Sequence, residues 1–145
     1  MTFQRTFSVS SESHGEMHGL TSRTDSIIVQ SGARTGVENV SVVGSTAAIG
    51  TVEFEPGLKR DLPDMLDRLI PPSQSYGHEQ AWHDGNGHSH LKATLIGPSV
   101  TLSVSEGEMA VGTWQQLFLI ELDIKPRVRE LIVTVQSEKT DRDPI

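Results

Sequence analysis

Histidine is concentrated in one short segment of this chain. Four of the six histidines lie within thirteen residues, namely His78, His83, His88 and His90. Imidazole serves both as a neutral metal ligand and as a proton carrier near neutral pH. Three imidazoles and a carboxylate can complete a metal site that keeps one position open. The segment is therefore the first candidate for a functional site, and its other polar residues are Glu79, Asp84 and Asn86.

Two local structures fit the end of this segment, and they favour different ligands. On a strand, the i, i+2 spacing of His88 and His90 places both rings on one face and suits metal chelation. The following residues favour a helix instead, because apolar positions share one stripe up to the stop signal Gly97-Pro98. We expect the helix, capped by Ser89 or His88, with His90 in its first turn, where free N–H groups favour an anion such as phosphate. A polar surface loop is the alternative for any single histidine.

Polar residues elsewhere can complete such a site. Glu53 follows an apolar strand and can act as a general acid or base if the strand end meets the histidines. A solvated carboxylate beside a turn is the alternative. Arg127 can clamp a phosphate or keep the edge of the last strand soluble. Thr113 and Gln115 are neutral hydrogen-bonding residues that can orient a substrate.

Length and charge limit the class of protein. The 145 residues have room for one domain, residues 1–145, whose charged tail at 137–145 is expected to fray. A net charge of −7 argues against nucleic acid as a partner. The absence of cysteine excludes a disulfide scaffold and a thiolate zinc site. Because no apolar run reaches the ~18 residues of a membrane span, we expect a cytoplasmic protein without membrane contact.

Apolar periodicity predicts mostly strands, with two or three helices between them. A short helix capped by Asp25 is expected to end near Gly32, and a helix over 57–70 is expected to kink or restart at Pro63. Strand 46–54 is expected to continue antiparallel from strand 37–43. The run Leu117–Ile120 is apolar on both faces, so it belongs in the centre of a sheet or at a subunit interface. The predicted fold class is α+β with mostly antiparallel, sandwich-like sheets. The other predicted strands are 3–9, 100–104, 109–111 and 131–135.

Three blocks of the sequence resemble one known family. Residues 99–123, SVTLSVSEGEMAVGTWQQLFLIELD, resemble the signature of the YjbQ-like family. Residues 45–62 and 76–99 resemble its other two blocks, so the likeness covers roughly residues 37 to 135. Many relatives carry a histidine before a Thr/Ser-Thr-Ala stretch, where this chain has Gly44-Ser45. If that histidine acts in relatives, either His83 or His88 replaces it here or the chemistry differs.

The resemblance implies a fold, an assembly and positions for the site. The expected fold is a compact α+β sandwich, assembled as a homotrimer with its sheets around the threefold axis and with clefts shared between subunits. By position, Glu53, His78, Asn86 and His90 match recurrent polar residues of the family. The stretch Thr113-Trp114-Gln115 matches its signature.

The resemblance also implies an activity. Members of the family are often labelled secondary thiamine-phosphate synthases, so the expected reaction joins hydroxymethylpyrimidine diphosphate to thiazole phosphate. The expected cofactor is a divalent metal, either Mg²⁺ or a Zn²⁺ ion bound by the histidine cluster. Two alternatives stay open: a metal-dependent hydrolase or lyase acting on another phosphorylated metabolite, and a non-catalytic trimer that binds a small anion or metal. The expected roles are catalysis by Glu53, His78 and His90, substrate binding by Asn86, Thr113, Gln115 and Arg127, and metal binding by His83, His88 and His90.

Overall fold

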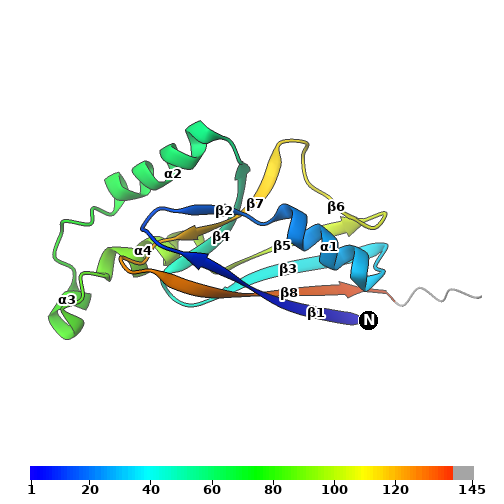
Figure 1. Ribbon diagram of the computed structural model, residues 1–145, viewed down its shortest axis with the longest axis horizontal. Coiled ribbons are helices and arrows are strands. Elements are labelled where there is room, and N and C mark those ends of the chain that lie inside the picture. The colour runs from blue at the N-terminus through cyan, green and yellow to red at the C-terminus, as the bar shows by residue number, and fades with distance from the viewer. Residues whose placement is uncertain (139–145) are drawn as a thin grey trace, which may run out of the picture.

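The computed structural model describes residues 1–138, which form two antiparallel sheets and four helices (Figure 1). The α+β class predicted from periodicity is confirmed. The five-stranded sheet has the order β1 (Thr2–Ser11), β8 (Arg127–Ser137), β3 (Thr35–Val43), β5 (Ser99–Ser105) and β6 (Glu108–Met109). The three-stranded sheet has the order β2 (Met17–Gly19), β7 (Gln115–Glu121) and β4 (Ala47–Glu53). The helices are α1 (Thr21–Ser31), α2 (Pro56–Leu69), α3 (Gly77–Trp82) and α4 (Gly87–Ile96).

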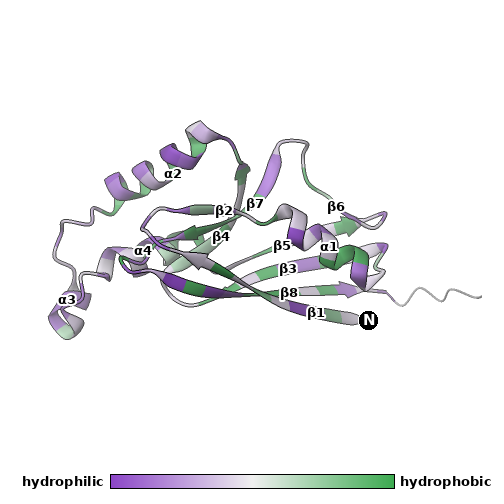
Figure 2. Cartoon of the chain, viewed as in Figure 1, coloured by the Kyte–Doolittle hydropathy of each residue, from purple (hydrophilic) through white to green (hydrophobic). Residues whose placement is uncertain are grey.

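The three-stranded sheet is the middle layer of the molecule. On one face, Ile49 and Leu119 pack against α1 and the inner face of the five-stranded sheet. On the other face, Phe118 and Ile120 pack against Leu66 of α2 and Ala93 of α4. Strand β7 is therefore buried on both sides, which confirms the central position predicted from its continuous apolar run. Figure 2 shows a hydrophilic start of β7, hydrophobic residues where the strand continues beside β4, and hydrophilic residues on the outer side of α2.

Strands β3 and β4 follow each other in the chain but belong to different sheets. β3 pairs with β5 and β8, whereas β4 pairs with β7. The prediction that the second strand continues antiparallel from the first is therefore wrong. Gly44, with φ +141°, carries the chain from one layer to the next at this point.

The β5–β6 hairpin is confirmed. Its turn residues Glu106 and Gly107 both have positive φ, as a two-residue type I′ turn requires.

The described part of the chain has four helices rather than the two or three predicted, and the predicted helices differ from expectation in their caps and at Pro63. α1 begins at Thr21, so Asp25 lies inside the helix rather than capping it, while the expected end at Gly32 is confirmed by its left-handed φ of 72°. α2 runs unbroken through Pro63 and is capped by Glu55, whose carboxylate accepts hydrogen bonds from the first-turn N–H groups. The described residues contain no helix long and apolar enough to cross a membrane. In the predicted tail, Ser137 ends β8, and residues 139–145 lie outside the described part.

Candidate functional site

The corner between α3 and α4 brings together three of the polar residues singled out from the sequence. His78 lies on α3, and its Nε2 is 3.0 Å from Oδ1 of Asp84, which follows the helix. The ring of His90, one turn into α4, approaches the ring of His78 with 4.6 Å between centroids. The backbone N–H of Asn86 bonds to Asp84 and is the main reason that the pKa of this carboxyl is lowered. An ionised carboxylate therefore lies beside the imidazole of His78, which in turn contacts that of His90.

Glu79 is the fourth member of this corner. Its Oε1 accepts a hydrogen bond of 2.7 Å from the N–H of Gly87, and its Oε2 accepts one of 3.0 Å from the N–H of Tyr76. These backbone bonds, that from Gly87 above all, lower the pKa of Glu79. The carboxylate thus holds the start of α3 against the start of α4. One ligand atom each from His78, Glu79 and Asp84 lie within 4.8 Å of one another, which is close enough for one metal ion to join them.

A small groove of about 170 Å³ adjoins the corner. His90 and Thr94 of α4 form one wall, and the Gly44-Ser45 turn forms the opposite wall. His90 therefore faces both the corner and the groove.

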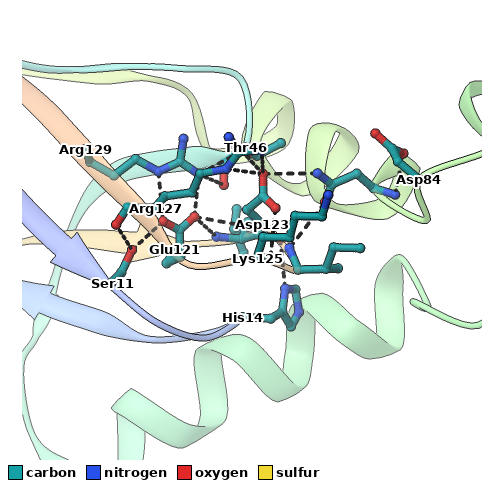
Figure 3. Close-up of polar contacts among 12 residues, drawn as sticks. Ser11, His14, Thr46, Asp84, Glu121, Asp123, Lys125, Arg127 and Arg129 are labelled. Atoms are coloured by element: carbon teal, nitrogen blue, oxygen red, sulfur yellow. Dashed lines mark hydrogen bonds and ion pairs between the residues drawn. The ribbon is translucent and has the colours of Figure 1, made fainter. Parts of the chain in front are cut away.

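Asp123 lies beneath the corner and fixes two of the predicted substrate-binding residues (Figure 3). Its Oδ2 accepts hydrogen bonds from Nδ2 of Asn86 and Nε of Arg127, each at 3.0 Å, and from the hydroxyl of Thr46 at 2.9 Å. Burial raises the pKa of Asp123, but the N–H of Lys125 and these side-chain donors outweigh it and lower the pKa to about 2. The predicted cap at Ser89 or His88 is wrong, because both residues lie inside α4 and Asn86 occupies the N-cap position. The side chain of Asn86 is held here, so it makes no capping hydrogen bond.

A second buried carboxylate lies next to the first. Glu121 pairs with Arg129, whose Nε is 2.8 Å from Oε1 and whose Nη2 contacts Oε2. Glu121 also accepts a hydrogen bond from the hydroxyl of Ser11, and Arg129 donates one to the carbonyl of Thr46. The alternative that Arg127 keeps the edge of the last strand soluble is wrong, because β8 is not an edge strand but lies between β1 and β3.

His88 faces away from the corner. Its Nδ1 is 2.8 Å from Nζ of Lys92, which is fully buried and pairs with Asp67 of α2 at 2.5 Å. Burial, followed by the charge of Lys92, lowers the pKa of His88 to about 4, so the imidazole is neutral at pH 7. His83 ends α3 with a φ of 53° and is exposed. Within residues 1–138, His83, His88 and His90 form no group of mutually close ligand atoms.

The remaining predicted residues lie at the other end of β4. Glu53 pairs in register with Gln115, whose Nε2 is 3.2 Å from the hydroxyl of Thr51, and Thr113 lies in the exposed loop before β7. Ala47, at the histidine end, is six residues from Glu53, a separation of about 20 Å along a strand. In a single chain, the predicted site residues therefore form two separate groups, one at the histidine end of β4 and one at its Glu53 end.

Solved structures of similar fold support the architecture. A YbjQ-like protein of unknown function from Sulfolobus solfataricus aligns with a TM-score of 0.85 and 31% identity, over 95% of this chain and 100% of that chain. An uncharacterized conserved protein of the yjbq/upf0047 family from Clostridium acetobutylicum aligns with a TM-score of 0.82 and 29% identity, over 91% of this chain and 99% of that chain.

Sequence relatives identify the family without supplying an activity. A UPF0047 protein of Methanothermobacter thermautotrophicus is 42% identical over 85% of this chain and 84% of its own length. The UPF0047 protein YjbQ of Salmonella typhimurium is 29% identical over 95% of this chain and all of its own length. None of these names indicates thiamine-phosphate synthase activity, and the Sulfolobus protein is described as having no known function. The predicted synthase activity is therefore wrong as an inference from the family. Residues 5–138 match the family pattern described as UPF0047 protein YjbQ-like, and the chain belongs to that family.

Proposed function

We propose that the chain binds a divalent transition metal at the α3–α4 corner and uses it to hold a small phosphorylated metabolite in the adjoining groove. The observation that carries the proposal is the approach of ligand atoms from His78, Glu79 and Asp84 to within 4.8 Å of one another. One imidazole and two carboxylates suit zinc or manganese. The ring of His90, whose centroid lies 4.6 Å from that of His78, is a candidate for a further ligand.

The chain's own residues prepare this site for a metal. Backbone hydrogen bonds keep Glu79 and Asp84 ionised, and ionised carboxylates are the form that binds metal. The same bonds orient the two carboxylates before any ligand arrives. A metal bound here supplies a Lewis acid for a phosphate oxygen. The hydroxyl of Ser45 in the groove can donate a hydrogen bond to the rest of the metabolite. The hydroxyl of Thr94 already donates to the carbonyl of His90, so it can only accept one.

We also propose that the protein works as a homotrimer, because one chain divides the candidate residues between two ends. The outer face of the five-stranded sheet supports association, since it carries neutral side chains that form hydrogen bonds with side chains of the neighbouring strand. Gln4 donates to Thr134, and Asn39 donates to Thr101. Trp114 is 72% exposed beside Glu53, and a large exposed aromatic side chain is typical of an interface. A neighbouring copy can therefore carry its Glu53 end to the histidine corner.

Native mass spectrometry of the full chain after incubation with Zn²⁺ and desalting tests both parts, because it counts chains and ions together. We expect three chains with one zinc ion each. His78→Ala should lose the zinc and remain trimeric. The matched control is His83→Asn, which replaces an exposed histidine by a residue that tolerates its left-handed backbone and should keep the zinc.

Two results would contradict the metal proposal: a wild-type protein that carries no zinc, or a His78→Ala protein that carries as much as the wild type. A monomeric mass at micromolar concentration would contradict the trimer. Loss of zinc in His83→Asn alone would favour the ligand set predicted from the sequence over the set proposed here.

A further inference from the structure

A cavity of about 300 Å³ lies between the edge strand β1 and the helix α1. Three consecutive residues of β1, from Arg5 to Phe7, form one wall. A single stripe of α1, at positions 23, 26, 27 and 30, forms the other wall, because residues three and four apart share one face of a helix. Arg5 and Arg23 bring two positive charges to this cavity, and no carboxylate of the described residues lines it.

The two arginines have no acidic partner in the part of the chain that the structure describes, since neither Arg5 nor Arg23 forms an ion pair there. Each guanidinium lies over an aromatic ring instead, at 4.1 Å from the centre of Phe3 for Arg5 and at 5.0 Å from that of Phe7 for Arg23. The chain has nineteen acidic and twelve basic side chains, so carboxylates are plentiful. Two cations that stay unpaired in such a chain are available to an anionic ligand.

Backbone carbonyls hold both guanidinium groups in place. Nη1 of Arg5 donates a hydrogen bond of 2.9 Å to the carbonyl of Gln4, and Nη1 of Arg23 donates one of 3.2 Å to the carbonyl of Ser8. These two carbonyls are four residues apart, which is about 13 Å along a strand. A guanidinium carries five N–H groups, and each of these side chains uses one of them in a bond to the described residues. The remaining N–H groups can bind a ligand.

The open edge of β1 adds a backbone donor to the cavity. Met1 and Ser137 exchange both of their backbone hydrogen bonds, and the pairing with β8 continues in register to Ser11. In an antiparallel pair, alternate residues exchange these bonds, so the backbone of Thr6 faces away from β8. No strand of the described residues pairs with β1 on that side. The N–H of Thr6, a residue that lines the cavity, is therefore free to donate.

A small anion fits this edge better than an extended peptide. A peptide that adds a strand to β1 needs both the N–H groups and the carbonyls of the open edge. The carbonyls of Gln4 and Ser8, on either side of Thr6, already accept hydrogen bonds from the two arginines. An anion needs donors alone, and the edge still offers them.

We propose that this cavity binds a small linear dicarboxylate, with one carboxylate at Arg5, the other at Arg23 and the apolar spacer against Phe7 and Ile27. Two anionic groups match two guanidinium groups that are held at separate points along the strand. The guanidinium fork suits a carboxylate because it can donate two parallel hydrogen bonds to it. The proposal depends on neither the metal nor the trimer proposed above, because it uses none of their residues.

The experiment titrates the full chain with hexanedioate at pH 7 in a calorimeter. Hexanoate and 1,6-hexanediol, of the same length, carry one charge and none. We expect hexanedioate to bind, hexanoate to bind at least tenfold more weakly and the diol not to bind. Added sodium chloride should weaken the binding of hexanedioate, because salt screens exposed charges.

Variants test the residues that line the cavity. Arg5→Gln and Arg23→Gln should each bind hexanedioate at least tenfold more weakly. Gln30→Glu, a change of similar shape that adds a negative charge to the cavity, should weaken binding severalfold. The matched control Arg68→Gln, at an exposed arginine of α2, should bind like the wild type. His78→Ala should also bind like the wild type, which keeps this test separate from that of the metal.

Several results would overturn the proposal. Absence of hexanedioate binding, equal affinity for hexanoate, or unchanged affinity in both arginine variants would each do so. Loss of binding in His78→Ala would place the dicarboxylate at the histidine corner instead. Dimers formed by the arginine variants of a protein that binds no dicarboxylate would show that the arginines only prevent pairing at the edge strand. Arg5, Arg23 and Gln30 are exposed, so their variants should fold, and urea unfolding of each variant checks this.

Discussion

Glu121 and Glu38 are both fully excluded from solvent, yet their surroundings are opposite. Glu121 has an arginine, a serine hydroxyl and two backbone N–H groups around its two oxygens. Glu38 has no partner among the described residues. Asp123, next to Glu121, has a pKa lowered to about 2, while burial raises that of Glu38 to about 8. Burial alone therefore does not decide whether a carboxylate in this core is charged; the donors around it do.

The two regions also differ in what surrounds them. The network of Glu121 and Asp123 connects β8, β7 and the start of α4, and it supports the histidine corner through Asn86. The carboxylate of Glu38 bonds to no other element among the described residues, and burial, followed by the charge of Asp25, raises its pKa. A satisfied network positions a neighbouring site, whereas an unsatisfied carboxyl group lowers the stability of the fold. The predictions below test this difference.

The largest effect is expected from breaking the satisfied region. Arg129→Met leaves Glu121 buried without its cation, and removing one partner of a buried pair costs about 3–5 kcal/mol. The free energy of unfolding in urea should fall by that amount. Arg127→Met is the matched control, because Arg127 is half-exposed and Asp123 keeps its other donors, so a loss of about 1 kcal/mol is expected. An equal loss of unfolding free energy in the two variants would show that the buried pair stabilises the fold no more than the half-exposed pair.

The opposite effect is expected from removing the unsatisfied carboxyl group. With a pKa of about 8 in the fold and 4.5 in the unfolded chain, Glu38 costs the fold about 3 kcal/mol at pH 7. The cost is absent below pH 4.5 and grows as the pH rises through 8, because the unfolded chain ionises first. Glu38→Leu should therefore be more stable than the wild type by about 3 kcal/mol at pH 7, with a gap that narrows by this amount towards pH 4.5. Urea unfolding at both pH values measures the gap, and a constant gap would contradict the prediction.

Local signals explain which parts of this fold could be predicted from the sequence. The Glu106-Gly107 turn, the left-handed Gly32 and the alternation of β1 and β8 each depend on neighbouring residues alone. The separation of β3 from β4 depends on pairings with strands far along the chain. The six-residue α3 was too short to produce a periodic pattern, although the carboxylate of Glu79 accepts a hydrogen bond from the N–H of Tyr76 at its start.

The site shows the same division. The histidine segment could be recognised from its composition, but the direction of each ring depends on helix phase. On an α-helix, i and i+2 residues point about 200° apart, so His88 and His90 cannot face the same ligand once the helix forms. The i, i+4 spacing of His88 and Lys92 was the available signal that His88 has an internal partner. The burial of Glu121 and Asp123 had a weaker signal, since these carboxylates directly follow or adjoin an apolar run.

The smallest effect tests how tightly the satisfied region is packed. Gly44 has φ +141°, and a Cβ atom there would lie 2.8 Å from Nη1 of Arg129. Gly44→Ala should therefore lower the free energy of unfolding by about 1–2 kcal/mol, through backbone strain and displacement of the guanidinium. Ser45→Ala, the next and equally exposed position, should change it by less than about 0.5 kcal/mol. Combining Gly44→Ala with Arg129→Met separates the two causes, because contact with the guanidinium disappears in the double variant and backbone strain does not. If Gly44→Ala lowers the free energy of unfolding equally in the wild type and in Arg129→Met, backbone strain causes the whole loss. Contact of the new Cβ atom with the guanidinium would then not weaken the Glu121–Arg129 pair.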